Sequence, residues 1–296
     1  MPDFVRQVPR AFNAPVLAQI AETGSSRTLS AILRHLPDLA RAGSLADAYQ
    51  QLYALLMERY RCEYVFKNQI ARELLLKRHP HAEARLLAEL RVGTCKADTV
   101  IVNGTSTVYE VKTELDTLDR LPRQLSAYRD VFDRVCVVSS GALLHRLTSS
   151  VPGWVGIVEL RSDGSIETVR EPGSNLAHIK PGAVFCMLRQ AEYLAALQAE
   201  FGEAPDVPNG IRWRVCRTLF EGLSPERAHA RMLEALRRRD WRDDKAAFVS
   251  AAPDALKHAA LTSTLPSKKR AALLDRLARP VALRRRRSEP TLLVRE

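Results

Sequence analysis

Residues 96–112, KADTVIVNGTSTVYEVK, are the most informative segment of this sequence for its fold. Residues 96–102 and 106–112 are rich in valine, isoleucine and threonine, the β-branched residues that favour strands. Between them, Asn103-Gly104-Thr105 is typical of the tight turn of a β-hairpin. The sequence therefore predicts two antiparallel strands that are largely buried.

Charged residues lie within this apolar hairpin. Side chains alternate between faces along a strand, so Glu110 and Lys112 point the same way, roughly 7 Å apart, and the turn brings Asp98 close to them. Neighbouring carboxylates are unfavourable unless a cation sits between them. Because Mg²⁺ prefers oxygen ligands, we expect Asp98, Glu110 and the carbonyl oxygen of Val111 to bind Mg²⁺, with Mn²⁺ as an alternative ion. Lys112 would orient the attacking water or stabilise transition-state charge.

The residues after the hairpin have the pattern of a crossover connection. Apolar residues recur at helical spacing over residues 118–134, and residues 135–138 are typical of a fully buried strand. A helix between two strands is what a parallel connection requires. Gln124 and Tyr128 share one face of that helix at four-residue spacing. Taken alone, this pair is better explained as a surface glutamine and a core tyrosine.

In its residues and their order, this set resembles the PD-(D/E)XK nuclease superfamily. The matching residues are Asp98, then Glu110-Val111-Lys112, then Gln124 and Tyr128, the last two as in RecB-like members. Residues 63–68 also resemble a bacterial, uncharacterised sce-type family. The resemblance covers roughly residues 60–160. It implies an α/β fold with a restriction-endonuclease-like mixed sheet flanked by helices, metal-dependent phosphodiester hydrolysis, and substrate placement by Gln124 and Tyr128.

The resemblance implies one more acidic residue, from a helix that precedes the hairpin. Glu63, in a helix predicted over residues 62–78, is the preferred metal ligand. The alternative for Glu63 is an ordinary ion pair with Lys67 at the i,i+4 spacing. Glu73 in the same helix and Glu89 just before the hairpin are the other candidates.

Composition narrows the class of protein. A chain of 296 residues with 46% hydrophobic residues can bury a substantial core. It has no apolar run near the roughly 20 residues that span a bilayer and no secretory signal pattern, so we expect a cytoplasmic protein without a membrane partner. Its five cysteines include no Cys-x-x-Cys pair, which argues against a disulfide framework or a zinc site. His79 and His81 are expected to be solvent-exposed rather than metal ligands.

The net charge of +11 is distributed unevenly. Residues 183–296 hold 22 Lys and Arg against 14 Asp and Glu, a surplus of eight, which leaves three for residues 1–182. A nucleic-acid partner, with DNA favoured, is the simplest explanation. A candidate phosphate-contacting surface with aromatic platforms consists of Trp213, Arg237, Arg238, Arg239, Trp241 and Arg242. The alternative is that these tryptophans are core residues and these arginines form a solvated face.

The chain is expected to divide into four parts, with a Pro- and Gly-rich linker at residues 173–182 between the second part and the third. They are an N-terminal helical segment over 1–60 that is irregular up to residue 26, a nuclease-like core over 61–172, an all-α domain over 183–280, and a basic, disordered tail over 281–296. Further strands are expected at 154–160 and 166–169, and helices at 184–201, 208–221, 224–238, 243–249 and 266–278.

The leading hypothesis is a bacterial, Mg²⁺-dependent nuclease that cuts DNA. The alternative is a non-catalytic nucleic-acid-binding or regulatory protein of a phage or mobile-element system. The sequence leaves the oligomeric state open.

Overall fold

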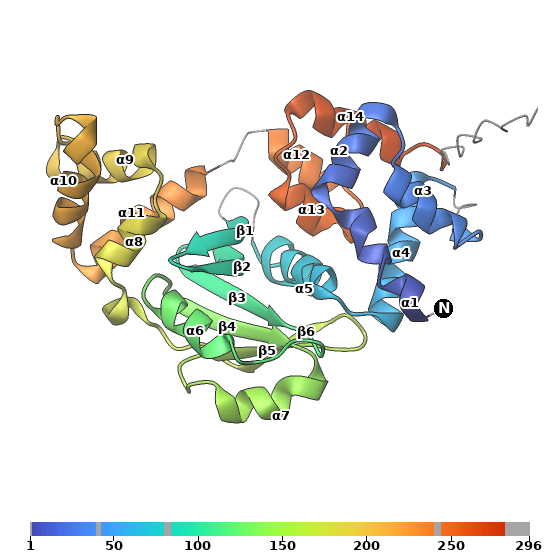
Figure 1. The fold of residues 1–296 in the computed structure, drawn as a ribbon, viewed down its shortest axis with the longest axis horizontal. Coiled ribbons are helices and arrows are strands. Elements are labelled where there is room, and N and C mark those ends of the chain that lie inside the picture. The colour runs from blue at the N-terminus through green and yellow to red at the C-terminus, as the bar shows by residue number, and fades with distance from the viewer. Residues whose placement is uncertain (1, 40–42, 80–83, 240–243, 282–296) are drawn as a thin grey trace, which may run out of the picture.

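A six-stranded mixed sheet is the centre of the molecule (Figure 1). We describe it from a computed structural model over residues 2–39, 43–79, 84–239 and 244–281. The strands lie side by side in chain order: β1 (Arg85–Val92), β2 (Cys95–Val102), β3 (Ser106–Lys112), β4 (Arg134–Ser139), β5 (Gly156–Leu160) and β6 (Ile166–Arg170). β1, β2 and β3 are antiparallel, β3, β4 and β5 are parallel, and β6 is antiparallel to β5.

The predicted hairpin is present as β2 and β3, and the predicted crossover helix is α6 (Leu121–Arg129). Two elements of this region were not predicted. Apart from Val92, strand β1 consists of leucines, an alanine and charged residues, so local propensity does not favour it and pairing with β2 holds it. Helix α7 (Gly141–Ser150) connects β4 to β5.

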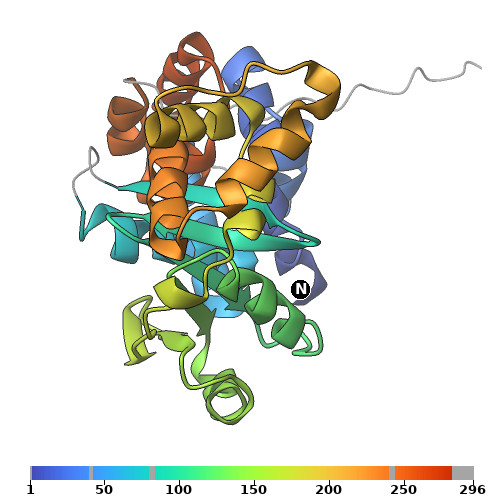
Figure 2. The ribbon, with the colours of Figure 1, turned by 90° about the vertical axis from the view of Figure 1, so that its left-hand side faces the viewer.

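Two apolar cores lie on the two faces of the sheet. Successive strand residues alternate between them, so that Ile101 joins one core and its neighbours Val100 and Val102 join the other. The face that buries Ile101 also carries the N-terminal helices and the last helices of the chain. The other face is covered by α6, α7 and the helices of residues 181–238 (Figures 1 and 2).

The N-terminal region is helical almost from its start. Its elements are α1 (Pro2–Val5), the 3₁₀ helix η1 (Val8–Phe12), α2 (Ala14–Thr23), α3 (Arg27–Arg34), α4 (Leu45–Arg59), α5 (Glu63–Gln69) and the π-helix η3 (Ile70–Leu76). The prediction that residues 1–26 are irregular was wrong. Pro9 and Pro15 each stand in the first turn of a helix, where the missing N–H is not needed.

The helices after the sheet fall into two groups. The first is α8 (Pro181–Met187), α9 (Gln190–Phe201), α10 (Asn209–Glu221) and α11 (Pro225–Arg238), which share a core with α6 and α7. The second is α12 (Asp244–Ala251), η5 (Asp254–Leu256), α13 (Lys257–Thr262) and α14 (Ser267–Leu277). It packs on the N-terminal helices at the opposite face (Figure 1).

The all-α region expected over 183–280 is therefore helical in its described part but does not share one core. The cause is that Phe248, Leu261 and Leu273 bury their side chains with the N-terminal core. The linker at 173–182 is docked on the sheet region, where buried Asn175 donates hydrogen bonds to backbone oxygens of Arg129 and Phe132.

Several predicted features lie outside the described residues. They are His81, Trp241, Arg242 and the basic tail beyond Val281. Within the described ranges, none of the helices combines the length and apolar character needed to cross a membrane.

Candidate metal centre

Carboxylates from three adjacent strands meet at one level of the sheet. The registers of β1 with β2 and of β2 with β3 both pass through Thr99. Continued by one residue, they set Asp98 between Glu89 of β1 and Glu110 of β3. Acidic residues directly opposite one another across strands repel, so a compensating positive charge is needed here.

Helix α5 adds a fourth carboxylate and a lysine. Oxygens of Glu63, Glu89 and Asp98 all lie within 4.8 Å of one another. The ammonium of Lys67, a buried residue, forms ion pairs with Glu63 and Glu89 and lies 3.6 Å from an Asp98 oxygen. Burial acts to lower the pKa of Lys67, but the charges of Asp98 and Glu63 outweigh it and raise that pKa. Glu63 therefore both forms the i,i+4 ion pair with Lys67 and lies beside Asp98.

Glu89 has a strained backbone. Its φ angle is 56°, in the left-handed region that residues other than glycine rarely adopt. The neighbouring pairs, Ala88 with Thr99 and Leu90 with Ala97, keep an unbroken register on either side. The strain is thus confined to one residue, and that residue carries a carboxylate of the cluster.

A second network surrounds Glu110, which is 1% exposed. Its carboxylate accepts hydrogen bonds from Lys112 Nζ at 2.7 Å, from the Tyr128 hydroxyl at 2.7 Å and from the Gln124 amide. Lys112 also donates to Gln124 Oε1 at 3.0 Å. The Gln124 and Tyr128 side chains thus both reach this network, although Tyr128 is also a core residue.

Asp98 lies between the two networks. Its Oδ2 accepts a hydrogen bond from the backbone N–H of Val111 at 2.9 Å. Burial and the neighbouring charge of Glu110 raise the pKa of Asp98 to about 7. A carboxyl group that is only partly ionised near neutral pH would gain its full charge if a cation bound beside it. The Val111 carbonyl, expected as a metal ligand, stays a prediction.

Other residues singled out in the sequence lie elsewhere or act differently. Glu73 pairs with Lys77 at 2.6 Å and is not part of the cluster. His79 is hydrogen-bonded to Asn103 at 2.9 Å, next to the hairpin turn. Arg239 forms an ion pair with Glu192 and is therefore not free to contact a phosphate.

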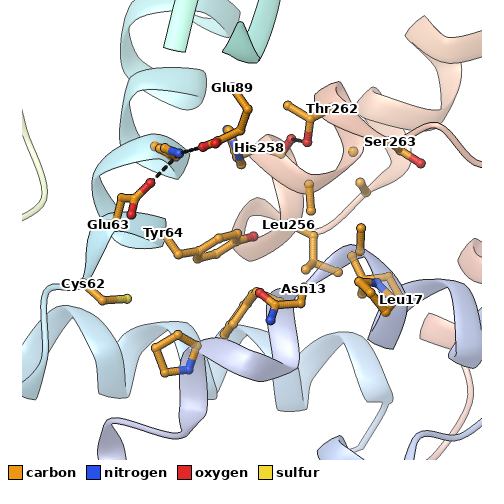
Figure 3. A pocket seen from close by; sticks show the side chains of 18 of the residues that line it. Asn13, Leu17, Cys62, Glu63, Tyr64, Glu89, Leu256, His258, Thr262 and Ser263 are labelled. Carbon is orange, nitrogen blue, oxygen red and sulfur yellow. Dashed lines mark hydrogen bonds and ion pairs between the residues drawn. The ribbon is translucent and has the colours of Figure 1, made fainter. Parts of the chain in front are cut away.

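Sequence reasoning missed His258, on α13, as a neighbour of the cluster. Glu63, Glu89 and His258 lie together at one side of a pocket (Figure 3). Burial lowers the pKa of His258 to about 3, with Lys67 adding to that effect and Glu89 opposing it. No local pattern could have found it, because the histidine is far from β1 in sequence and reaches that strand only through the packing of α13.

The donor set fits a hard divalent ion. Oxygens that share one Mg²⁺ at about 2.1 Å each lie no more than about 4.2 Å apart, so carboxylates within 4.8 Å need only small adjustments. Glu63, Glu89 and Asp98 would supply these oxygens. Lys67 would have to move away from them, because its ammonium lies among the same oxygens.

Known proteins similar to this chain come from a phage and from a bacterium. A family model described as bacteriophage P4 protein cII matches residues 57–264, which include every residue of the site. Protein cII of Enterobacteria phage P4 is 30% identical over 95 residues, 31% of this chain and 36% of that protein, so the match spans about a third of the relative's length. A solved structure of a protein of unknown function from Silicibacter pomeroyi has a TM-score of 0.33 and 15% identity, over 48% of this chain and 94% of that one.

Proposed function

The chain belongs to the bacteriophage P4 protein cII family, and we propose that it is a divalent-metal-dependent nuclease of a phage or mobile-element system. Its substrate would be nucleic acid, with DNA favoured, and its reaction the hydrolysis of a phosphodiester bond. The observation that carries this proposal is the position of Asp98, which lies beside the Glu63 and Glu89 carboxylates and whose pKa is raised by burial and by the charge of Glu110, the ion-pair partner of Lys112.

The order of elements supports the same assignment. Helix α5, the antiparallel strands β1 to β3, the crossover α6 and the parallel strand β4 follow one another in the chain. Asp98 is on β2, and Glu110 and Lys112 are on β3. Apart from β1, which was not predicted, this is the order of elements that the resemblance to PD-(D/E)XK nucleases leads us to expect, with Glu63 on the preceding helix.

Each residue has a distinct role in this mechanism. A bound Mg²⁺ or Mn²⁺ would polarise the phosphoryl oxygen and lower the pKa of a coordinated water. Glu110 holds the Lys112 ammonium in place, and this ammonium would stabilise negative charge on the phosphate. A carboxylate has about four lone-pair sites, so Glu110, with its three donors, keeps one site for a metal ion.

A cleavage assay tests the proposal. Purified protein is incubated with linear, circular and single-stranded DNA and with RNA, each with Mg²⁺, Mn²⁺ or a chelator. We expect cleavage that the chelator abolishes and that Lys112→Ala and Asp98→Ala each reduce by at least about 10²-fold. Lys77→Ala, which removes an exposed lysine outside the site, should cut like wild type. Equal cleavage by wild type, Lys112→Ala and Asp98→Ala would refute the site assignment.

A second candidate is a non-catalytic nucleic-acid-binding or regulatory protein of a phage or mobile-element system. Two observations favour it: family membership, and the Lys67 ammonium, which already neutralises part of the acidic cluster. This candidate predicts salt-dependent nucleic-acid binding without cleavage in either metal, and binding that Asp98→Ala leaves unchanged.

A further inference from the structure

A pocket of about 900 Å³ adjoins the acidic cluster. It lies between the N-terminal helices and the group α12 to α14, and Glu63, Lys67 and Glu89 are part of its wall (Figure 3). Its volume is in the range of pockets that bind whole small molecules. A group that entered it would therefore be next to whatever the carboxylates bind.

Most of the remaining wall is apolar and aromatic. The rings of Phe12 and Tyr64 lie 4.5 Å apart between centroids, tilted by 32°. Leu17 and Leu256 line the same pocket (Figure 3). Such a surface suits a flat ring system better than a flexible aliphatic chain.

One polar group in this wall has an unused hydrogen-bonding atom. His258 is 8% exposed, and its Nδ1 is buried without a hydrogen-bond partner. A neutral imidazole offers one donor and one acceptor, so it could pair with the polar edge of a heterocycle. Buried polar atoms are nearly always paired in folded proteins, so a ligand group could complete this one once the side chains that cover it move aside.

The rim of the pocket presents an exposed apolar side chain. Leu115 follows the Lys112 strand closely and is 66% exposed. Its loop is fixed by Asp116, whose carboxylate accepts hydrogen bonds from the backbone N–H and the hydroxyl of Thr113, both at 2.8 Å. Arg6 and Asn13, both exposed, lie on the lining as well. Leu115 is thus held where it could stack on a base at the entrance.

We propose that this pocket receives an unpaired nucleobase of the strand whose phosphate lies at the acidic cluster, so that the substrate is single-stranded nucleic acid or an unpaired end. This assignment rests on the proposed function for the placement of the phosphate. A nucleobase has apolar faces and a polar edge, which match the aromatic wall and the His258 nitrogen. In a continuous duplex, stacking and pairing keep a base out of such a pocket unless it is flipped.

Binding of defined oligonucleotides tests the pocket independently of cleavage. Fluorescence anisotropy in Ca²⁺ compares a labelled single strand, the same sequence as a blunt duplex, and a strand of equal length in which abasic sites replace the bases. We expect the single strand to bind about tenfold more tightly than either of the others, the gain that stacking of one base contributes.

Two variants localise the effect. Ala18→Trp, on the pocket wall, should abolish the preference by filling the space, whereas Gln19→Trp, on the same helix but not on the lining, should retain it. Leu115→Ala should weaken the preference severalfold without affecting folding, and Val169→Ala, another exposed apolar residue, should not.

The outcomes separate the pocket from the nuclease. Equal affinity for the normal and abasic strands, or an intact preference in Ala18→Trp, would overturn the base-binding role even if the protein cuts DNA in Mg²⁺. A preference that Ala18→Trp abolishes, in a protein that cuts nothing in Mg²⁺ or Mn²⁺, would support the pocket and refute the nuclease.

Discussion

Two aspartates contact the two ends of β3: Asp133 is buried and Asp98 is half-buried, and their surroundings differ. Asp133 contacts the beginning of the strand and accepts hydrogen bonds from the hydroxyls of Thr105 and Ser174, both at 2.6 Å, and from the N–H of Asn175 at 3.1 Å. Burial acts to raise the pKa of Asp133, but these neutral donors outweigh it and lower that pKa. Asp98 contacts the end of the strand, and its pKa is raised to about 7 by burial and by Glu110.

The difference shows what distinguishes a structural carboxylate from a site for a cation. Around Asp133 the donors are already supplied by the fold, and they attach the linker at Ser174 and Asn175 to the sheet region. Around Asp98 the nearest groups include other carboxylates, so a metal ion would improve the local electrostatics. Four measurements test this difference and the carboxylates that surround Asp98.

The largest effect is expected for Asp133→Ala. This change leaves three donors without their charged acceptor, so the free energy of unfolding should fall by at least about 3 kcal/mol, measured by urea denaturation at pH 7. The folded-state pKa is lowered, so the stabilisation is present above pH 4 and is lost as the pH falls. Asp275→Ala, at an exposed ion pair, should cost less than about 1 kcal/mol. Equal losses would contradict the structural role of Asp133.

Metal binding should stabilise the folded protein, and more strongly at high pH. At a hundredfold excess of Mn²⁺ over its Kd, the gain is about 2.7 kcal/mol. Asp98 must be deprotonated to bind the ion, so the rise in Tm should be larger at pH 8 than at pH 6. Asp98→Asn should lose most of this rise, and an equal rise in wild type and variant would place the ion elsewhere.

Asp98→Asn should stabilise the metal-free protein at pH 8. Because the folded-state pKa of Asp98 is raised, the folded state binds more protons than the unfolded state between about pH 4 and pH 7. Wild-type stability therefore falls over that window, and the variant should avoid the loss and be about 1–3 kcal/mol more stable at pH 8. At pH 4 the two should be nearly equal. A variant less stable than wild type at pH 8 would show that Asp98 resembles Asp133.

The smallest effect concerns the backbone of Glu89. Glu89→Gly and Glu89→Gln both remove the carboxylate, but only glycine adopts a φ of 56° without strain. We expect the glycine variant to be more stable than the glutamine variant by about 1 kcal/mol. The backbone of Ala88 is not strained, so Ala88→Gly should instead destabilise the protein by up to about 1 kcal/mol. The reverse order at position 89 would show that this residue is unstrained in solution.

The sequence was informative where local chemistry decides the structure. β-Branched runs around Asn103-Gly104 predicted the hairpin, and alternation along its strands predicted that Glu110 and Lys112 share a face, where they form an ion pair. Helical spacing predicted that Gln124 and Tyr128 lie together, and both contact Glu110.

The sequence was uninformative where distant segments decide the structure. Strand β1 forms by pairing with β2, and this pairing brings Glu89 level with Asp98. The sequence suggested Lys67 only as a partner of Glu63, yet its ammonium also pairs with Glu89 and lies 3.6 Å from an Asp98 oxygen. His258 reaches the cluster because the apolar side chains of the last helices are buried in the N-terminal core. No local periodicity encodes such contacts.

We propose that Asp98 and its acidic neighbours bind a divalent ion. The most direct measurement is an anomalous difference map from crystals soaked in Mn²⁺. We predict a peak coordinated by Asp98 and by at least one of Glu63, Glu89 and Glu110, with the Lys67 ammonium displaced. The absence of a peak at this cluster in millimolar Mn²⁺, with Lys67 still between Glu63 and Glu89, would contradict the claim.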